Sequence, residues 1–168
     1  VDGNYGTIGV VLGNHASDGE TVVTETSARA AATCRWNADR NGVENMRVEL
    51  TSDIRSIRDG FDVAVFVPIP YTPDEVINDR IVAAVSRLTT DGTMYLAGTK
   101  ADGIDRYCET LADVTAGLEQ VASNGCDIYR ARKLAEFNDR RFLTEHEFRA
   151  TVGDYTCRFL TVPGLFSW

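Results

Sequence analysis

Apolar runs alternate with amphipathic segments along most of the chain. Short apolar runs bounded by turn residues are typical of buried strands, and apolar positions three or four residues apart indicate helices. The expected strands are Glu20–Glu25, Arg47–Leu50, Phe61–Val67 and Thr93–Ala97. The expected helices are Ile8–His15, Ser27–Arg40, Pro73–Leu88 and Ile104–Ala122. Regular alternation of strands and helices predicts a mostly parallel α/β sheet.

Local signals support several helix ends. Ser27 is a suitable N-cap, and Gly42 lies just beyond the end of the same helix. Pro73 suits a first-turn position, and the next two residues are acidic, as the helix dipole favours. The pair Asn124-Gly125 is expected to end the helix that begins at Ile104.

The last part of the chain has a different pattern. Cys126–Lys133 and Tyr155–Val162 are expected to be strands, with a helical turn near Thr144–Phe148. Two late strands after an alternating region predict an antiparallel pair at one edge of a parallel sheet. We therefore expect a single α/β domain over residues 1–168 with about seven strands, mostly parallel.

The charge composition indicates which binding partners and which kind of source organism to expect. The net charge is −8, and only Lys100 and Lys133 among the 17 basic residues are lysines. An acid excess with few lysines predicts a halophilic source, and an ordinary acidic bacterial protein is the alternative. The acid excess argues against a nucleic-acid surface that covers the whole molecule. No apolar run reaches the roughly 18 residues of a membrane helix, so we expect no membrane contact.

The four cysteines predict neither a metal site nor a disulfide framework. They form no C-x-x-C motif, and no histidine lies near any of them in the sequence. Cys34 lies in an alanine-rich helical stretch and is expected in the core. Reduced, buried cysteines fit a cytoplasmic protein.

The N-terminal stretch VDGNYGTIG has the composition of a nucleotide-binding loop. An acidic residue, Asp2, precedes glycines that include Gly6, and a helix follows. Glycine lets a ligand approach the backbone, and the N–H groups of a helix N-terminus favour negative charge. Glu25 ends a strand 19 residues after Gly6, where a carboxylate could accept hydrogen bonds from ribose hydroxyls. Asp53 follows the next strand and could contact an adenine amino group.

Each of these residues also has a purely structural interpretation. Glycine turns after strands are common. Glu25 could be a charge that favours the N-terminus of the helix beginning near Ser27, and Asp53 could be a turn residue or an N-cap. Together and in this order, Asp2, Gly6, Glu25 and Asp53 are a stronger signal of a nucleotide site than any one of them.

Taken together, the motifs resemble those of class I S-adenosylmethionine-dependent methyltransferases. The resemblance rests on VDGNYGTIG, the passage VVTETSARAAATCRWNADRNGVENMRV, then TSD, FDVAVFVPIP and DGTMYLAG. The stretches LAGTKADGI, GCDIYRARKL and YTCRFLTVPGLFSW resemble the N-terminal domain of the ribosomal RNA small subunit methyltransferase C family. The resemblance implies a Rossmann-like fold with S-adenosylmethionine as the ligand. It also implies a longer protein whose second methyltransferase domain, C-terminal to this one, is catalytic.

The chain departs from the active members of that family at two motifs. The glycine positions of the family loop D-x-G-x-G-x-G here hold Asn4, Gly6 and Ile8. The family motif Asn-Pro-Pro-aromatic, which orients the target amino group and stacks on its base, corresponds here to Val67, Pro68, Ile69 and Pro70. Valine accepts no hydrogen bond through its side chain, and Ile69 has no ring. Tyr71, one residue later, could still stack on a base.

Basic residues concentrate late in the acidic chain and could contact rRNA phosphates. They are Arg130, Arg132, Lys133, Arg140 and Arg141. The alternative is local pairing with acids such as Glu136 and Asp139.

The predicted function is a non-catalytic methyltransferase-like N-terminal domain of an rRNA guanine-N2 methyltransferase. It would support the catalytic domain and help position rRNA, and we expect weak or absent cofactor binding through Asp2, Gly6, Glu25 and Asp53. The main alternative is an active methyltransferase in which Tyr71 lies near the substrate. A nicotinamide-dependent oxidoreductase is disfavoured because no Tyr-x-x-x-Lys motif is present. A structural dimerisation module is a third alternative.

Overall fold

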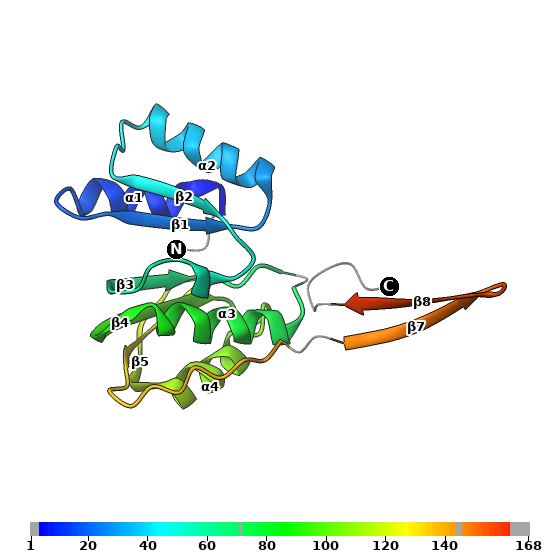
Figure 1. The fold of residues 1–168 in the computed structure, drawn as a ribbon. Helices are drawn as coiled ribbons and strands as arrows, with labels where there is room; N and C mark the ends of the chain where they lie inside the picture. Colours follow the sequence, from blue (N-terminus) through cyan, green and yellow to red (C-terminus); the bar gives the residue numbers. More distant parts are fainter. Residues whose placement is uncertain (1–3, 71, 144–145, 162–168) are drawn as a thin grey trace.

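The computed structural model describes residues 4–70, 72–143 and 146–161. Its elements follow the expected alternation as far as α4 (Figure 1). The helices are η1 (Asn4–Gly6), α1 (Thr7–His15), α2 (Ala28–Arg40), η2 (Ile54–Ser56), α3 (Asp74–Ser86) and α4 (Ile104–Val114). The strands are β1 (Thr21–Glu25), β2 (Met46–Leu50), β3 (Phe61–Phe66), β4 (Leu88–Gly98), β5 (Thr115–Ser123), β6 (Asp127–Lys133), β7 (His146–Val152) and β8 (Tyr155–Thr161).

The first part of the chain forms a small layer of two parallel strands and two helices. β1 pairs in parallel with β2, and Val23 lies opposite Val48 in the register. α2 begins as expected, because the Ser27 side chain accepts a hydrogen bond of 3.4 Å from the Ala30 N–H. Cys34 is fully buried, together with Val23 and Ala31, which confirms its expected place in the core.

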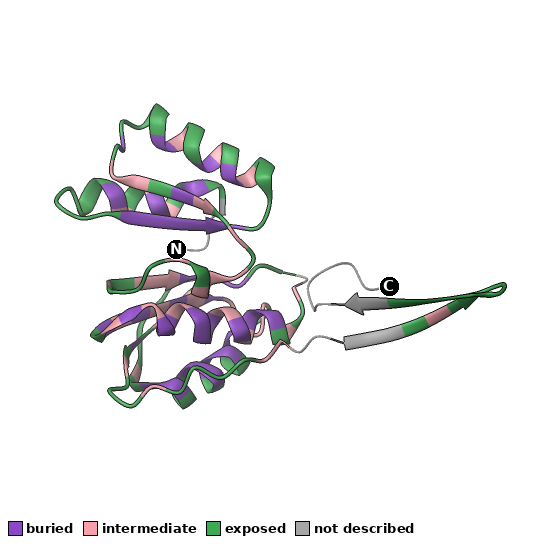
Figure 2. Cartoon of the chain, viewed as in Figure 1, coloured by how far each residue is buried: buried purple, intermediate pink, exposed green. Residues whose placement is uncertain are grey.

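The middle of the chain forms a mixed sheet with its own core. The strand order is β3-β4-β6-β5, in which β3 and β4 are parallel and β6 is antiparallel to both of its neighbours. α3 and α4 pack against this sheet, and Figure 2 shows their buried sides in purple. The largest fully buried side chains here include Phe66, Ile81, Met94, Leu96 and Leu111. Burial of this apolar surface is the main source of stability for the unit.

The expected helix Ile104–Ala122 is wrong beyond Val114, because the second half is strand β5. Gly117 has φ +66°, a conformation that interrupts a helix and produces a register shift in the strand. As a strand, the segment can instead pair with β6, and it does so from Thr115 to Ser123. Cross-strand pairing outweighed the helical pattern of this segment.

The expected seven-stranded, mostly parallel sheet is also wrong. In the described residues, eight strands form a parallel pair, a mixed sheet of four and a separate antiparallel pair. The two late strands expected to pair with each other do not: β6 lies between β4 and β5, and β8 pairs with β7. Where a helical turn was expected near Thr144–Phe148, the described residues begin strand β7. Its polar and apolar residues alternate, which is the strand period.

The β7–β8 pair projects from the body as a two-stranded ribbon (Figure 1). None of the described helices is long and apolar enough to span a membrane.

Candidate functional site

The loop before α1 has the close backbone packing that its glycines predict. Gly6 has φ +83°, and a Cβ on this residue would lie 3.1 Å from the Cα of Cys34. A Cβ on Gly9 would lie 2.4 Å from Cγ2 of Val23, so this glycine lets α1 pack tightly on β1. The glycines therefore serve helix packing as well as any approach of a ligand. Asp2, expected beside them, lies outside the described residues.

Tyr5 is the strained residue of this loop. It has φ +60°, the only positive φ among the described non-glycine residues. An aromatic residue rarely adopts this conformation, and such outliers occur most often at functional sites. The Asn37 amide donates a 2.7 Å hydrogen bond to the Tyr5 carbonyl, which helps to hold the turn. The side chain of Tyr5 is 64% exposed and is free of the core.

Glu25 lies at the carboxyl end of β1, as predicted, and is buried. Its carboxylate Oε1 lies 4.0 Å from the Cys34 thiol. Thr24, Glu25, Thr51, Ser52, Ile54 and Arg80 are among the residues that line a cavity of about 10 Å³ here. That volume accommodates about one water molecule, far less than a nucleoside.

Asp53 follows β2 at the same edge of the sheet, and it has the structural role that was its alternative interpretation. Its Oδ1 accepts a 2.9 Å hydrogen bond from the Arg55 N–H and caps η2. Its Oδ2 lies 4.0 Å from the Arg141 guanidinium. The parallel pairing of β1 with β2 thus brings Glu25 and Asp53 to one edge, while Asp53 is already engaged in a turn.

Arg55 connects this edge to the segment that follows β6. Its guanidinium donates to Asp79 Oδ2 and Asp139 Oδ1, both at 2.8 Å, and to the Arg140 carbonyl at 3.1 Å. Burial alone would lower the pKa of Arg55, but the hydrogen bonds to the two carboxylates outweigh it and raise the pKa. The Phe142 N–H also donates to Asp79, at 3.1 Å. The buried ion pair of Arg55 with Asp79 joins η2 to α3, and the segment after β6 is fastened to both of its members.

The exit of β3 opens into a larger cavity of about 320 Å³. Phe66 is buried at the end of the strand, and Val67 is half-buried. Pro68, Ile69, Pro70, Thr72, Asp74, Ala101, Asp102, Arg106 and Tyr107 line the cavity. Three of the four residues that replace the family motif, Pro68, Ile69 and Pro70, therefore border a hollow at the carboxyl ends of β3 and β4. Tyr71, proposed for base stacking, lies outside the described residues.

A hydrogen-bond network forms one wall of this cavity. Asp74 accepts from the Tyr107 hydroxyl at 2.9 Å and from Arg106 at 2.7 Å. Thr99 donates to Asp102 at 2.6 Å. Burial, and then the bond to Asp74, raise the pKa of Tyr107, so it remains a neutral donor at pH 7. The wall combines two carboxylates with an arginine, so it has no strong net preference for anions.

Sequence reasoning missed the residues of this wall. Asp74 was interpreted as a helix-dipole residue, and residues 99–107 were not considered as site residues. The available signal was their position, since they follow the strands at Phe61 and Thr93, and parallel strands place ligands at their carboxyl ends. The pairing of Asp74 with Tyr107, 33 residues apart, has no local signature.

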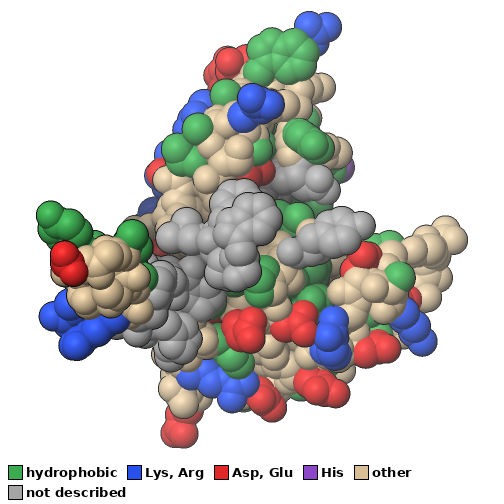
Figure 3. Space-filling view, turned by 90° about the vertical axis from the view of Figure 1, so that its right-hand side faces the viewer, with side chains coloured by type: hydrophobic (Ala, Val, Ile, Leu, Met, Phe, Trp, Pro, Cys, Tyr) green, Lys and Arg blue, Asp and Glu red, His purple; other side chains and the backbone are tan. Residues whose placement is uncertain are grey.

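The late basic residues have mostly intramolecular partners. Arg130 donates to Glu119 on β5, and Arg140 donates to Asp113 at 2.9 Å. Lys133 donates to the Ser86 and Leu88 carbonyls at 3.1 and 2.6 Å. Burial, and then nearby Arg87, lower the pKa of Lys133. Arg141 is the residue near Asp53, whereas Arg132 is exposed and has no side-chain hydrogen bond or ion pair to a described residue. On the face in Figure 3, Lys and Arg lie among Asp and Glu and form no continuous basic patch.

Comparison with solved structures places this fold among methyltransferases. The Thermus thermophilus (T. Thermophilus) 16S rRNA N2 G1207 methyltransferase RsmC, in complex with AdoMet and guanosine, matches with a TM-score of 0.73 and 22% identity. The match covers 87% of this chain and 38% of RsmC, so the chain spans well under half of that protein.

Two further structures were solved with S-adenosylhomocysteine. NodS from Bradyrhizobium japonicum matches with a TM-score of 0.61 and 15% identity, over 79% of this chain and 74% of NodS. A putative methyltransferase from Streptococcus mutans matches with a TM-score of 0.58 and 14% identity, over 79% of this chain and 85% of that one. These three neighbours were solved with S-adenosylmethionine or S-adenosylhomocysteine bound, and the class I methyltransferase fold expected from the sequence is confirmed.

A comparison with curated protein sequences gave no match. A model of the methyltransferase small domain family matches residues 2–130, which include the glycine loop, both parallel strand pairs and the β3 exit. Because that match spans most of the chain, this protein belongs to the methyltransferase small domain family.

Proposed function

We propose that this chain is a non-catalytic methyltransferase-like domain of an rRNA guanine-N2 methyltransferase. In this proposal it supports a catalytic methyltransferase domain of the same polypeptide and helps to position rRNA. The likeness to RsmC, a 16S rRNA N2 methyltransferase, supports rRNA as the class of substrate. The match covers 38% of RsmC, which supports the presence of a further domain.

The observation that carries the proposal is the exit of β3. Pro68, Ile69 and Pro70 border the cavity with apolar side chains, and Val67 directly precedes them, where transfer to an amino group needs a hydrogen-bond acceptor to orient it. The carboxylates nearby are already engaged: Asp74 by Tyr107 and Arg106, and Asp102 by Thr99. A substrate amino group would therefore have to share either carboxylate with the donors that already orient it.

The described residues fit S-adenosylmethionine poorly. The cavity beside Glu25 has room for about one water, and Arg80 lines it. Asp53, the expected adenine contact, is engaged as the cap of η2. Gly6 still permits close backbone approach, but Ile8 occupies a family glycine position. Each hydrogen bond that is lost costs about 1 kcal/mol, so binding no tighter than roughly millimolar is expected.

The contribution to RNA positioning rests on Arg132 and its neighbours. Arg132 is exposed on β6, and Arg130 lies on the same face of that strand, where it pairs with the half-exposed Glu119. Exposed pairs of this kind are weak and can exchange for a phosphate. Lys133, Arg140 and Arg141 contribute less in this proposal, because each already has an intramolecular partner.

Calorimetry with S-adenosylhomocysteine and a methyl-transfer assay on small-subunit rRNA test the proposal. We expect no micromolar binding and no turnover above a protein-free control. Restoring the loop with Asn4→Gly and Ile8→Gly should tighten binding if the cleft is otherwise open. Ile8→Gly costs about 1 kcal/mol of helix stability, so the unfolding curve is measured beside the affinity. Micromolar binding or turnover by the unaltered chain would contradict the proposal.

The alternative function is an active S-adenosylmethionine-dependent methyltransferase. The 320 Å³ cavity favours it, because that volume is large enough for a small ligand. Under this alternative, Asp102→Asn should reduce turnover, whereas Asp91→Asn, at a distant exposed position of β4, should not. Under our proposal, there is no turnover for either substitution to change.

A further inference from the structure

The β7–β8 ribbon is amphipathic, and its apolar face is uncovered among the described residues. Its register pairs Ala150 with Cys157 and Val152 with Tyr155 on one face. Val152 is 77% exposed and Tyr155 is 78% exposed. Thr151 and Thr156 are hydrogen-bonded to each other on the opposite face, at 3.0 Å.

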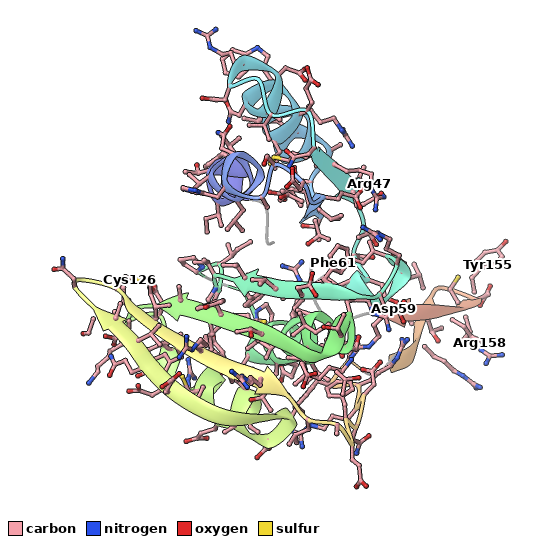
Figure 4. All side chains as sticks on the ribbon, turned by 90° about the vertical axis from the view of Figure 1, so that its left-hand side faces the viewer. Arg47, Asp59, Phe61, Cys126, Tyr155 and Arg158 are labelled. Carbon is pink, nitrogen blue, oxygen red and sulfur yellow. The ribbon has the colours of Figure 1, made fainter. Side chains whose placement is uncertain are left out.

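The opposite face is the polar one. It also holds the directly paired Arg149 and Arg158, which belong to the same side of the strands as the two threonines. Figure 4 shows Tyr155 and Arg158 pointing to opposite sides of the ribbon. Strand alternation thus separates a charged side from an apolar side, as in a sheet with one buried face.

The buried clusters of the described residues do not include this ribbon. Neither β7 nor β8 contributes a described residue to the two buried clusters, and Figure 1 shows the ribbon extending away from them. A lone two-stranded hairpin is marginally stable in water and needs a further strand or a packed apolar face. The sequence nevertheless maintains apolar residues on one side, which indicates that this side is covered in the assembled protein.

We propose that the apolar face of the ribbon docks on the second methyltransferase domain of the same polypeptide, against an apolar surface of that domain. The identity of the partner rests on the proposed function. Size is the first argument for a tethered domain. Strands of seven residues give a face about 24 Å long, and with a width of about 10–12 Å the contact buries roughly 500–600 Å² in total.

That area separates the candidate occupants. Stable complexes between free proteins bury about 1,200–2,000 Å², so two ribbons that met face to face would form a poor dimer. Contacts between domains of one chain begin near 600 Å², because the tether supplies a high effective concentration. The contact expected here is close in size to the smallest contacts between domains of one chain.

Charge argues for protein rather than RNA on this face. Nucleic-acid affinity comes mainly from Lys and Arg contacts with phosphates. The described members of the apolar face, Ala150, Val152, Tyr155 and Cys157, carry no charge, whereas Arg149 and Arg158 lie on the other side. An uncharged aliphatic and aromatic surface suits the apolar face of another folded domain.

Hydrogen exchange of the full-length protein and of the 168-residue chain tests the inference, with Val152→Lys as the variant and Thr151→Lys as its matched control. The two substitutions add the same charge at adjacent positions on opposite faces. We expect ribbon amides to exchange at least about tenfold more slowly in the full-length protein, because burying one valine side chain is worth that factor or more. Val152→Lys should abolish this protection and Thr151→Lys should retain it.

The other outcomes are distinct. Unchanged ribbon exchange beside a folded second domain would overturn the inference and leave the proposed function intact. A full-length protein without a further domain would refute both. Protection that appears only after small-subunit rRNA is added would identify RNA as the occupant and overturn the inference. Protection that rises with the concentration of the 168-residue chain alone would identify a second copy, with the same consequence. Since Val152 is exposed in that chain, unaltered melting of its Val152→Lys form confirms that the body still folds.

Discussion

Replacing Arg55 by methionine should destabilise the protein far more than replacing any exposed arginine. The Arg55 side chain is 7% exposed and that of Asp79 is 12% exposed, and their ion pair is 2.8 Å long. Methionine preserves most of the volume but leaves the Asp79 carboxylate buried with only the Phe142 N–H as a described donor. Breaking one side of a buried ion pair costs about 3–5 kcal/mol. The second partner, Asp139, is 37% exposed and adds less than about 1 kcal/mol.

Urea denaturation followed by circular dichroism measures the free energy of unfolding. Arg58→Met is the matched control, because Arg58 also pairs with an acid, Glu20, but its side chain is 57% exposed. The free energy of unfolding of Arg58→Met should fall by less than about 1 kcal/mol. The double variant Arg55→Met/Asp79→Asn should recover part of the loss, since it removes the buried charge while an amide oxygen still accepts from Phe142.

The same change should release the segment after β6. Arg55 also donates to the Arg140 carbonyl, so the backbone at 139–142 loses its attachment to η2 in the variant. Limited proteolysis should then cut this segment first. If Arg55→Met costs no more than Arg58→Met, the buried contact contributes nothing net and the reasoning is refuted.

Three further outcomes are expected. The pKa of Glu20 is lowered, chiefly by its hydrogen bond from Arg47, so Glu20 stabilises the fold above its unfolded pKa of about 4.5 and stops doing so as pH falls through the folded pKa. Glu20→Gln should therefore lower the free energy of unfolding by less than about 1 kcal/mol at pH 7 and leave it unchanged in strong acid, as measured from urea midpoints. Burial raises the pKa of Cys108 to about 11, so a thiol reagent at pH 8 should titrate the two exposed cysteines quickly and this one only after unfolding; a fast third thiol would contradict this. Gly9→Ala should lower the melting temperature, because its Cβ would meet Val23 at 2.4 Å, whereas Gly19→Ala, with its nearest atom at 3.6 Å, should be neutral; equal melting temperatures would refute the packing argument.

Local patterns predicted the elements whose signals lie within a few residues. Ser27 caps α2 because its hydroxyl needs only the N–H three residues ahead. The strand at Thr21–Glu25 and the exit of Phe61–Phe66 were recognisable as short apolar runs. Their order along the chain was also sufficient to place Glu25 and Val67 at the carboxyl ends of strands, because right-handed crossovers leave few arrangements of parallel strands.

Tertiary contacts decided the rest. Thr115–Ser123 has a helical pattern, yet it is a strand because β6 offers it a complete set of backbone partners. The sequence around Asp53 does not distinguish an adenine contact from a cap of the turn, and only the fold brings Arg141 to 4.0 Å from its carboxylate. Arg55 and Asp139 are 84 residues apart, and their pairing depends on burial that no local window contains. Residue type and local spacing specify hydrogen bonds within a turn, whereas strand partners and buried charges are set by which surfaces the whole chain removes from water.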